Sequence, residues 1–472
     1  MSPSSEAYLD ALLDLGSFVS WDTRIEIASE DPGYRRELRR AARTSGHDES
    51  ILTGTGRIEG RRVALVVGVF EFLAGSIGTA AARRIITAIE RATAERLPLL
   101  AAPASGGTRM QEGTRAFVLM ADLARAVSEH RRHGLAYVAH LRHPTTGGAF
   151  ASWGSLGHFT AAEPGALLAF SGPRVHATLT GTRFPEGVQT AENLSARGVI
   201  DAVLTPEEMR ATMARIVRVT EGRDRRPVET TPLPRSPADG TDWASVLLTR
   251  DAGRPGLREL LARATDVVEF HGTNEGERDD AVVVALADLG GASWVVVGHD
   301  RTAPAPMGPA GLRQAQRGMD LAEQLGLPLL TVVDTAGADL SPAAEEGALA
   351  GEIARSLARI TALAVPSVSV ILGQGTGGGA LALVPARRVV AAQHAWLSPL
   401  LPEGASAIVY RDTAHAAEMV ERQGVGSDTL FANGVVHEVV PEPRPAHLDP
   451  ESFLAGVVGA CVRQLKDQDR TV

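Results

Sequence analysis

The two halves of the chain repeat one another at a constant spacing of 230 residues. The segment Leu-Pro-Leu-Leu at 97–100 recurs at 327–330, and Thr-Gly-Gly at 146–148 recurs at 376–378. Further matches at the same offset pair Gly78 with Gly308, Arg83 with Arg313 and Gly107 with Gly337. Several matches at one ungapped offset favour an internal duplication over chance enrichment in a chain rich in Gly, Ala and Leu. The chain is therefore expected to hold two domains of one plan.

A proline-rich stretch separates the repeats. Residues 221–240 contain four prolines, several charges and no apolar periodicity, which is typical of a linker. We therefore predict one domain at 1–225, a linker at 226–240 and a second domain at 241–472. The length of 472 residues is enough for two or three domains of ordinary size.

Each half alternates short apolar runs with helical stretches. In the first half, a β-rich run at 63–72 precedes a helical stretch at 79–96 and apolar runs at 97–102 and 136–141. The second half follows the same order, with segments at 281–298, 312–325, 327–333 and 367–372. Strands that alternate with helices predict a parallel sheet with crossover connections. Ligands bind such sheets at the carboxyl ends of the strands, where the glycine turns of this chain lie.

Composition agrees with a soluble α/β protein and excludes other classes. Gly is frequent (49 residues) and aromatic residues are few (4%), which favours α/β layers over a β-sandwich. The net charge of −9 argues against a nucleic-acid binder. No apolar run has transmembrane length and no signal peptide opens the chain, so we expect no membrane association and a cytoplasmic location.

The scarcity of two residue types removes several chemistries. Cys461 is the only cysteine, so an intrachain disulfide and a thiolate zinc site are excluded. Lys466, near the C-terminus, is the only lysine, and the chain therefore lacks both a phosphate-binding Walker loop and an upstream Schiff-base lysine. No metal site is expected, because His130, His133, His140 and His143 have no further ligands nearby.

The first glycine turn spans residues 105–113, Ser-Gly-Gly-Thr-Arg-Met-Gln-Glu-Gly. It follows an apolar strand, and we expect it to open a helix that runs through Leu123. Amides at a helix N-terminus lack intrahelical partners, and two glycines would let a ligand oxygen approach them. Such donors form an oxyanion hole, which stabilises an enolate or a tetrahedral species. A plain tight turn with glycine torsions explains the pattern equally well.

The second glycine turn spans residues 373–380 and contains G-x-G-x-x-G. A dinucleotide site would also require an acidic residue near the end of the next strand, and residues 389–396 contain none, which argues against that site. Glu112 and Glu163 are candidate general bases, although solvated carboxylates are the simpler interpretation.

The two halves resemble the two subunits of the acetyl-CoA carboxylase carboxyltransferase in order. The first half resembles the β subunit through residues 70–78, 105–113, 143–148, 162–164, 170–175, 185–187 and 198–201. The second half resembles the α subunit through residues 298–299, 308–317, 333–338, 373–382, 398–404 and 434–436. This resemblance implies an α/β fold of two crotonase-like (ClpP/crotonase) ββα-spiral domains related by duplication.

The resemblance also implies the site. Gly106 and Gly107 would polarise the thioester carbonyl of an acyl-CoA, while Gly379 and Ala380 would hold the ureido oxygen of biotin. The substrate-binding residues implied are Gly75, Ser76, Gly78, Arg109, Gly147, Gly148, Gly172, Pro173, Gly337 and Gly378.

The implied reaction moves a carboxyl group from carboxybiotin to acetyl-CoA, or to a close acyl-CoA, and gives malonyl-CoA or its homologue. Biotin would arrive on a separate carrier protein, so a biotin carboxyl carrier and a biotin carboxylase are implied partners, together with a homodimer or a higher homo-oligomer. Departures from the family at Gln374 and at 271–276 fall on the biotin side. They leave open a biotin-independent malonyl-thioester decarboxylase or carboxyl transferase, and a non-catalytic scaffold.

Overall fold

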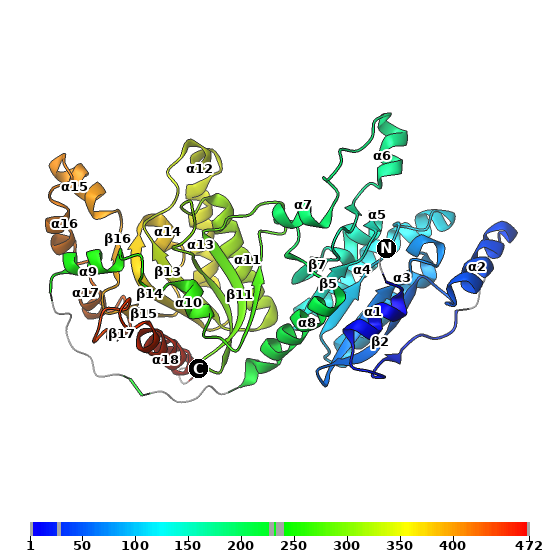
Figure 1. The fold of residues 1–472 in the computed structure, drawn as a ribbon, viewed down its shortest axis with the longest axis horizontal. Helices are drawn as coiled ribbons and strands as arrows, with labels where there is room; N and C mark the ends of the chain where they lie inside the picture. Colours follow the sequence, from blue (N-terminus) through cyan, green and yellow to red (C-terminus); the bar gives the residue numbers. More distant parts are fainter. Residues whose placement is uncertain (1–2, 26–29, 226–230, 233–239, 470–472) are drawn as a thin grey trace. The chain divides into compact units, whose positions relative to one another are not determined.

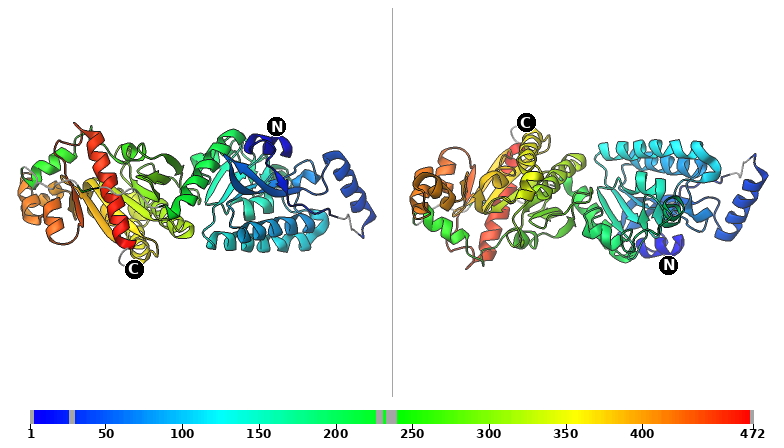
Figure 2. Two further views of the ribbon diagram at one scale, coloured as in Figure 1. Left: turned by 90° about the horizontal axis from the view of Figure 1, so that it is seen from below. Right: turned by 90° about the horizontal axis from the view of Figure 1, so that it is seen from above.

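The chain folds into two units, each built on one mixed β-sheet (Figures 1 and 2). The computed structural model describes residues 3–25, 30–225, 231–232 and 240–469. The units comprise Met1–Thr220 with Asn274–Gly276, and Glu221–Thr273 with Glu277–Val472. Most of the predicted linker, 226–240, lies outside the described residues.

The sheet of the first unit has the strand order β1-β2-β3-β4-β5-β7-β9. Its strands are β1 (Val19–Ser20), β2 (Ile51–Ile58), β3 (Arg61–Gly68), β4 (Leu99–Ala102), β5 (Tyr137–Leu141), β7 (Phe159–Ala162) and β9 (Ala202–Val203). The pairs β1–β2 and β2–β3 are antiparallel, and every later pair is parallel. A small parallel sheet joins β6 (Thr145–Thr146) to β8 (Leu168–Ala169).

The sheet of the second unit repeats this plan, in the order β10-β11-β12-β13-β14-β15-β17. Its strands are β10 (Asp266–Phe270), β11 (Val282–Leu289), β12 (Ala292–His299), β13 (Leu329–Thr335), β14 (Ser367–Thr376), β15 (Arg388–Ala392) and β17 (Glu438–Val440). Two antiparallel pairs again precede four parallel pairs. The end of β14 also pairs with β16 (Trp396–Ser398), as β6 pairs with β8.

Strand registers confirm the duplication and correct its spacing. Leu99 lies opposite Tyr137, and Leu329 lies opposite Ser367, so the offset is 230 on both strands. In the preceding hairpin, however, Ala64 pairs with Leu99 whereas Val295 pairs with Leu329, an offset of 231. The connection after β3 is one residue longer than the one after β12, so the offset of 230 begins only at the first long helix. It ends after β5 and β14, because Val138 pairs with Phe159 and Val368 with Arg388, an offset of 229 on the later strand.

Helices cover the sheets and bury their apolar stripes. In α3 (Thr79–Ala94) the buried residues recur every three or four positions, as in an amphipathic helix. It packs with α4 (Gly113–Arg132) in a core that includes Ile85, Ile89, Leu123 and Trp153. In the second unit α11 (Pro309–Leu325) packs against α13 (Leu349–Ala362) and against β11 and β12. No helix in the described part of the chain is long and apolar enough to cross a membrane.

The remaining helices are α1 (Ser5–Leu12), α2 (Pro32–Ser45), η1 (Leu73–Gly75), η2 (Met110–Glu112), α5 (Gly147–Ala149), η3 (Phe150–Gly154), α6 (Pro173–Thr180), α7 (Ala191–Ala196), α8 (Pro206–Glu221), η4 (Gly222–Asp224), α9 (Asp242–Thr249), α10 (Leu257–Leu261), α12 (Pro342–Glu346), α14 (Gly377–Leu381), α15 (Pro402–Tyr410), α16 (Ala416–Gln423), α17 (Ser427–Ala432) and α18 (Pro450–Asp469).

Candidate active site

The first glycine turn, 105–113, follows β4 and ends at Gly113, where α4 begins, so it opens a helix that includes Leu123 as predicted. Gly106 and Gly107 lie before that helix, so the prediction that their amides are free at its N-terminus is wrong. The Gly106 N–H donates to the Ala74 carbonyl at 2.8 Å, and the Gly107 N–H donates to the Ser105 hydroxyl at 3.0 Å. Gly107 has a φ of 108°, which side chains rarely adopt. Both amides are therefore engaged within the turn.

Two other amides at this turn remain available. The N–H of Thr108 has no acceptor among the described residues. The β-bridge at this point consists of two other hydrogen bonds: the Ile77 N–H donates to the Gly107 carbonyl, and the Arg109 N–H donates to the Ile77 carbonyl. Gly148 is the second residue of α5, so its N–H has no intrahelical acceptor. A Cβ on Gly148 would lie 2.7 Å from the Thr108 hydroxyl oxygen, which places the two segments in direct contact.

Gly107 and Gly147 also meet at this point. A Cβ on Gly107 would lie 3.5 Å from the Gly147 Cα, and one on Gly147 would lie 3.2 Å from the Gly107 Cα. Gly147 has a φ of 61°, in the left-handed region. The structure thus brings together the predicted residues Gly106, Gly107, Gly147 and Gly148, and the absence of side chains lets the two turns approach.

The second unit repeats this arrangement. Gly337 has a φ of 130°, and its N–H donates to the Thr335 hydroxyl at 3.0 Å, as Gly107 does to Ser105. Gly377 has a φ of 65°, close to the 61° of Gly147. A Cβ on Gly379 would lie 3.3 Å from the Ala338 amide nitrogen. Gly379 and Ala380 are buried in α14 beside this turn.

A strained segment supports the first turn from the other side. Leu73, Ala74 and Gly75 have consecutive positive φ values of 47°, 54° and 64°. Such a conformation costs roughly 1–3 kcal/mol at each non-glycine residue, and it persists only where the surroundings enforce it. A Cβ on Gly75 would lie 1.9 Å from the Ala104 carbonyl oxygen, so only glycine allows this close approach.

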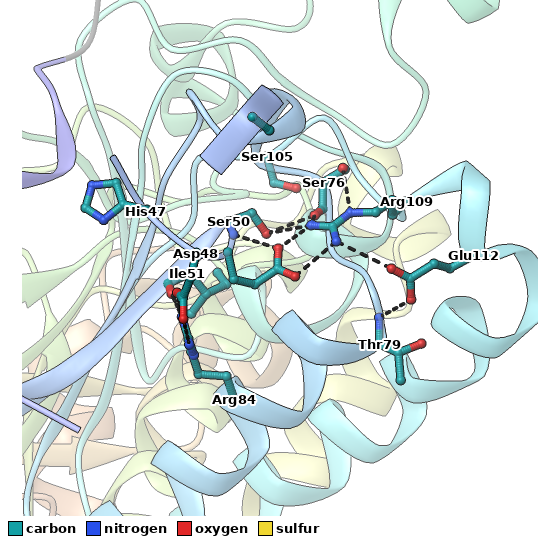
Figure 3. Close-up of polar contacts among 12 residues, drawn as sticks. His47, Asp48, Ser50, Ile51, Ser76, Thr79, Arg84, Ser105, Arg109 and Glu112 are labelled. Carbon is teal, nitrogen blue, oxygen red and sulfur yellow. Dashed lines mark hydrogen bonds and ion pairs between the residues drawn. The ribbon is translucent and has the colours of Figure 1, made fainter. Parts of the chain in front are cut away.

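Arg109, expected to contact a ligand, is instead buried. Its side chain is 1% exposed, and its guanidinium bonds to Glu49, Ser76 and neighbouring groups (Figure 3). Burial favours a lower pKa for Arg109, but the hydrogen bonds and charge of Glu49 raise the pKa above its usual range. Gly78 packs on this group, since a Cβ there would lie 2.7 Å from the Arg109 Nη1.

Of the two acidic candidates, Glu163 is buried and Glu112 is partly exposed, so the interpretation as a solvated carboxylate is wrong for Glu163. Glu163 is buried and accepts the His143 N–H at 3.1 Å. Glu112 accepts the Thr79 N–H at 2.6 Å at the start of α3. Burial opposes ionisation of Glu112, yet the hydrogen bonds from Thr79 and Tyr34 lower its pKa. Both carboxylates therefore accept backbone N–H groups near the turn.

Gly172 and Pro173 lie apart from these contacts. They begin α6, which projects from the body of its unit (Figure 1). A Cβ on Gly172 would meet nothing within 4 Å. The helix leaves Val175 54% and Leu179 79% exposed. The structure therefore does not bring Gly172 to the glycine contacts of the first turn.

Sequence reasoning missed three buried polar residues at the second turn. Asp334, at the end of β13, accepts the Gln374 N–H at 3.0 Å and pairs with Arg301 at 3.0 Å. Burial raises the pKa of Asp334, and the Arg301 guanidinium offsets this only in part. His299 and Thr376 are buried, and within the described part of the chain neither side chain has a hydrogen-bond partner. Each of these three residues lies at or next to the end of an apolar strand, and this position was the sequence signal that could have indicated them.

Burial lowers the pKa of His299 to about 4, so its imidazole is neutral at pH 7. The buried imidazole of His130 bonds to the Thr93 hydroxyl, and that of His140 bonds to the Tyr8 hydroxyl. No cluster of three or more His, Cys, Asp or Glu side chains suited to a metal occurs among the described residues.

The comparisons with known proteins agree on one family. The chain matches the carboxyl transferase domain over residues 7–467. The probable biotin-dependent acyl-coenzyme A carboxylase beta3 subunit of Mycobacterium tuberculosis is 52% identical over 466 residues, covering 97% of this chain and 93% of the relative. The acetyl-coenzyme A carboxylase carboxyl transferase subunits beta/alpha of Salinispora arenicola are 38% identical, covering 98% of this chain and 86% of the relative.

Solved structures show the same fold. Transcarboxylase 12S, whose crystal structure has hydrolysed methylmalonyl-coenzyme A bound, aligns with a TM-score of 0.75 at 19% identity, covering 97% of this chain and 89% of that chain. A single-chain, multi-domain long-chain acyl-CoA carboxylase aligns with a TM-score of 0.76 at 17% identity, covering 98% of this chain and 46% of that chain.

The chain thus has two copies of one α/β plan, each with a glycine-lined turn, and it shares this fold with transcarboxylase 12S. The chain belongs to the carboxyl transferase domain family, and it is a carboxyltransferase.

Proposed function

We propose that the chain is the carboxyltransferase subunit of a biotin-dependent acyl-CoA carboxylase that carboxylates acetyl-CoA or a close homologue. The observation that carries this proposal is the paired amide turn, which in both units has glycines of positive φ and the same hydrogen bond from a glycine N–H to a hydroxyl two residues earlier. Relatives of 52% and 38% identity that are named as acyl-CoA carboxylase subunits support it.

The first turn serves the thioester. In this proposal the N–H groups of Thr108 and Gly148 donate to the thioester oxygen and stabilise the enolate that forms when the α-proton leaves. Gly106 and Gly107, predicted as donors, instead shape the turn, because their own N–H groups are engaged. No side-chain base is needed at this turn, because in this proposal the ureido nitrogen of the carboxyl donor would take the α-proton.

The second turn serves the carboxyl donor. Gly378, Gly379 and Ala380 present first-turn amides of α14, and Gly337 lies on the facing segment. The buried Thr376 hydroxyl, which has no partner among the described residues, adds a group able to donate or accept. This set fits a ureido group, which has one carbonyl oxygen and two N–H groups. When bound, carboxybiotin would supply the carboxyl group as CO2, and the ureido nitrogen that has lost this group would take the α-proton.

Exposed apolar side chains support a homo-oligomer. The helix α6 exposes Val175 and Leu179, and α15 exposes Ile408 by 64% and Val409 by 50%. Large apolar side chains grouped on one helix are typical of an interface. The relative transcarboxylase 12S is described as a hexamer. We propose that two or more copies of this chain associate through these helices.

The proposal is tested by reconstitution with a biotin carboxylase and a biotinylated carrier protein. Labelled bicarbonate, ATP and either acetyl-CoA or propionyl-CoA are supplied, and the labelled acyl-CoA product is quantified. We expect product only when chain, carrier and acyl-CoA are all present, and the ratio of the two rates identifies the acyl group. Transfer to neither acyl-CoA, with a carrier shown to be carboxylated, would refute the proposal.

A further inference from the structure

The buried group around Arg109 lies directly beside the first turn. Figure 3 shows the Arg109 guanidinium directed toward Ser76 and Glu112, and Arg109 is buried. The side chains of Arg109 and Glu49 are 1% and 3% exposed. Charged side chains are almost never this buried unless they are paired, so this pair calls for a physical role.

The guanidinium makes a full set of contacts. Its Nη1 donates to the Glu49 Oε2 at 3.0 Å, its Nη2 donates to the other Glu49 oxygen, and the pair is therefore bidentate. The Nη2 also donates to the Ser76 carbonyl at 2.7 Å, and the Nε donates to the Ser76 hydroxyl at 3.3 Å. Tyr34 and Glu112 complete the shell at 3.3 and 3.4 Å. No N–H group is left for a substrate.

These contacts join the side chains of three segments. Glu49 precedes β2, Ser76 follows the strained segment 73–75, and Arg109 lies in the first turn. The backbone repeats the connection, because Ile77 donates to the Gly107 carbonyl and the Arg109 N–H donates to the Ile77 carbonyl, both at 2.9 Å. The position of Thr108, between these two hydrogen bonds, therefore depends on where Arg109 is held.

We infer that Arg109 is a positioning residue, which together with Glu49 fixes the Thr108 amide at the distance from Gly148 that the enolate oxygen requires. This inference rests on the proposed function of the first turn. Lysine cannot replace Arg109, because a single ammonium group cannot form the bidentate pair with Glu49 and also reach Ser76. A shift of about 1 Å in a catalytic donor lowers a rate by about 10²-fold.

A matched control lies on the neighbouring helix. Arg84 of α3 is also buried, with its side chain 7% exposed, and it pairs with Asp48 at 2.9 Å (Figure 3). It also donates to the carbonyls of Thr23 and Ile51. Asp48 is 34% exposed, so Arg84→Lys perturbs a partly buried pair in the same unit, and none of these hydrogen bonds of Arg84 reaches the turn.

The test compares Arg109→Lys and Glu49→Gln with Arg84→Lys and Asp48→Asn in the complete carboxylase assay. We expect the first pair to lower kcat by about 10²-fold for Arg109→Lys and less for Glu49→Gln, with KM for acyl-CoA changed less than threefold. The control pair should lower the thermal midpoint without lowering kcat more than threefold. Equal kcat losses in both pairs, or a loss confined to KM, would overturn the inference.

Amide hydrogen exchange makes the test independent of catalysis. In Arg109→Lys and Glu49→Gln we expect faster exchange in the peptide covering residues 104–113, whereas Arg84→Lys should leave that peptide at the wild-type rate. If the wild-type enzyme proved inactive, the proposed function would be refuted. The exchange rates would still test whether Arg109 and Glu49 hold the first turn in place. Unchanged exchange at 104–113 in both Arg109→Lys and Glu49→Gln would overturn the inference.

Discussion

Gly148→Ala tests the first oxyanion hole most locally. The new Cβ would lie 2.7 Å from the Thr108 hydroxyl oxygen and 3.3 Å from the Met120 sulfur. The first distance is shorter than real Cβ contacts, so Thr108 has to shift, and with it the neighbouring amide donor. Overpacking of this kind costs roughly 1–3 kcal/mol of stability, which a unit of this size tolerates. The fold is expected to remain while the two donors lose their alignment.

The substitution keeps the N–H of residue 148 and displaces it relative to Thr108, so the expected loss is at most that of removing one oxyanion donor. Removing such a donor lowers kcat by about 10²–10³-fold, or roughly 3–4 kcal/mol in the barrier. The assay is carboxylation of acyl-CoA at saturating substrate, with circular dichroism as the check on folding. Gly351→Ala in α13 is the control, because its Cβ makes ordinary contacts and alanine stabilises a helix by about 0.5–1 kcal/mol. A folded Gly148→Ala enzyme with wild-type kcat would refute the assignment of Gly148.

Three further predictions concern other parts of the chain. Gly379→Val should abolish transfer but leave the fold, since even the first carbon would lie 3.1 Å from the Met307 methyl carbon and 3.3 Å from the Ala338 nitrogen; retained turnover would exclude Gly379 from the site. Because His299 has a pKa of about 4 when folded and about 6.5 when unfolded, only the unfolded chain takes up this proton between those values, so stability should fall as pH drops from 6.5 to 4. His299→Asn should flatten that part of the unfolding-midpoint profile, and an unchanged slope would contradict the assignment. Burial raises the pKa of the Cys461 thiol to about 12, so iodoacetamide at pH 8 should label it only as fast as the protein unfolds, and rapid labelling of folded protein would show that the thiol is accessible.

The duplication and the turns could be predicted from sequence because they leave short-range signals. Glycines at fixed offsets mark backbone conformations that other residues rarely adopt, and Gly107 and Gly337 share a positive φ as their spacing suggested. Apolar runs located β4 and β13 to within about two residues at each end. The first hairpin strand, β2, was missed, since Ile51–Ile58 contains two glycines and a threonine pair in place of an apolar run.

The identity of the amide donors could not be predicted in the same way. The glycines of Ser105–Thr108 suggest an open turn, but whether an amide is free depends on acceptors distant in sequence, such as the Ala74 carbonyl for Gly106. The role of Arg109 depends likewise on Glu49, 60 residues earlier. Long-range pairs of this kind leave no pattern in a single sequence, and an arginine beside a glycine turn therefore suggests a ligand contact.

The central claim is that one chain joins thioester chemistry to a biotin carboxyl acceptor. It is tested most directly by the reverse half-reaction, in which the purified protein is given malonyl-CoA with and without free biotin and acetyl-CoA release is followed. We predict background release without biotin and a rate that rises and saturates with added biotin. Decarboxylation at a rate that biotin does not change would contradict the claim, and it would instead indicate a biotin-independent malonyl-thioester decarboxylase.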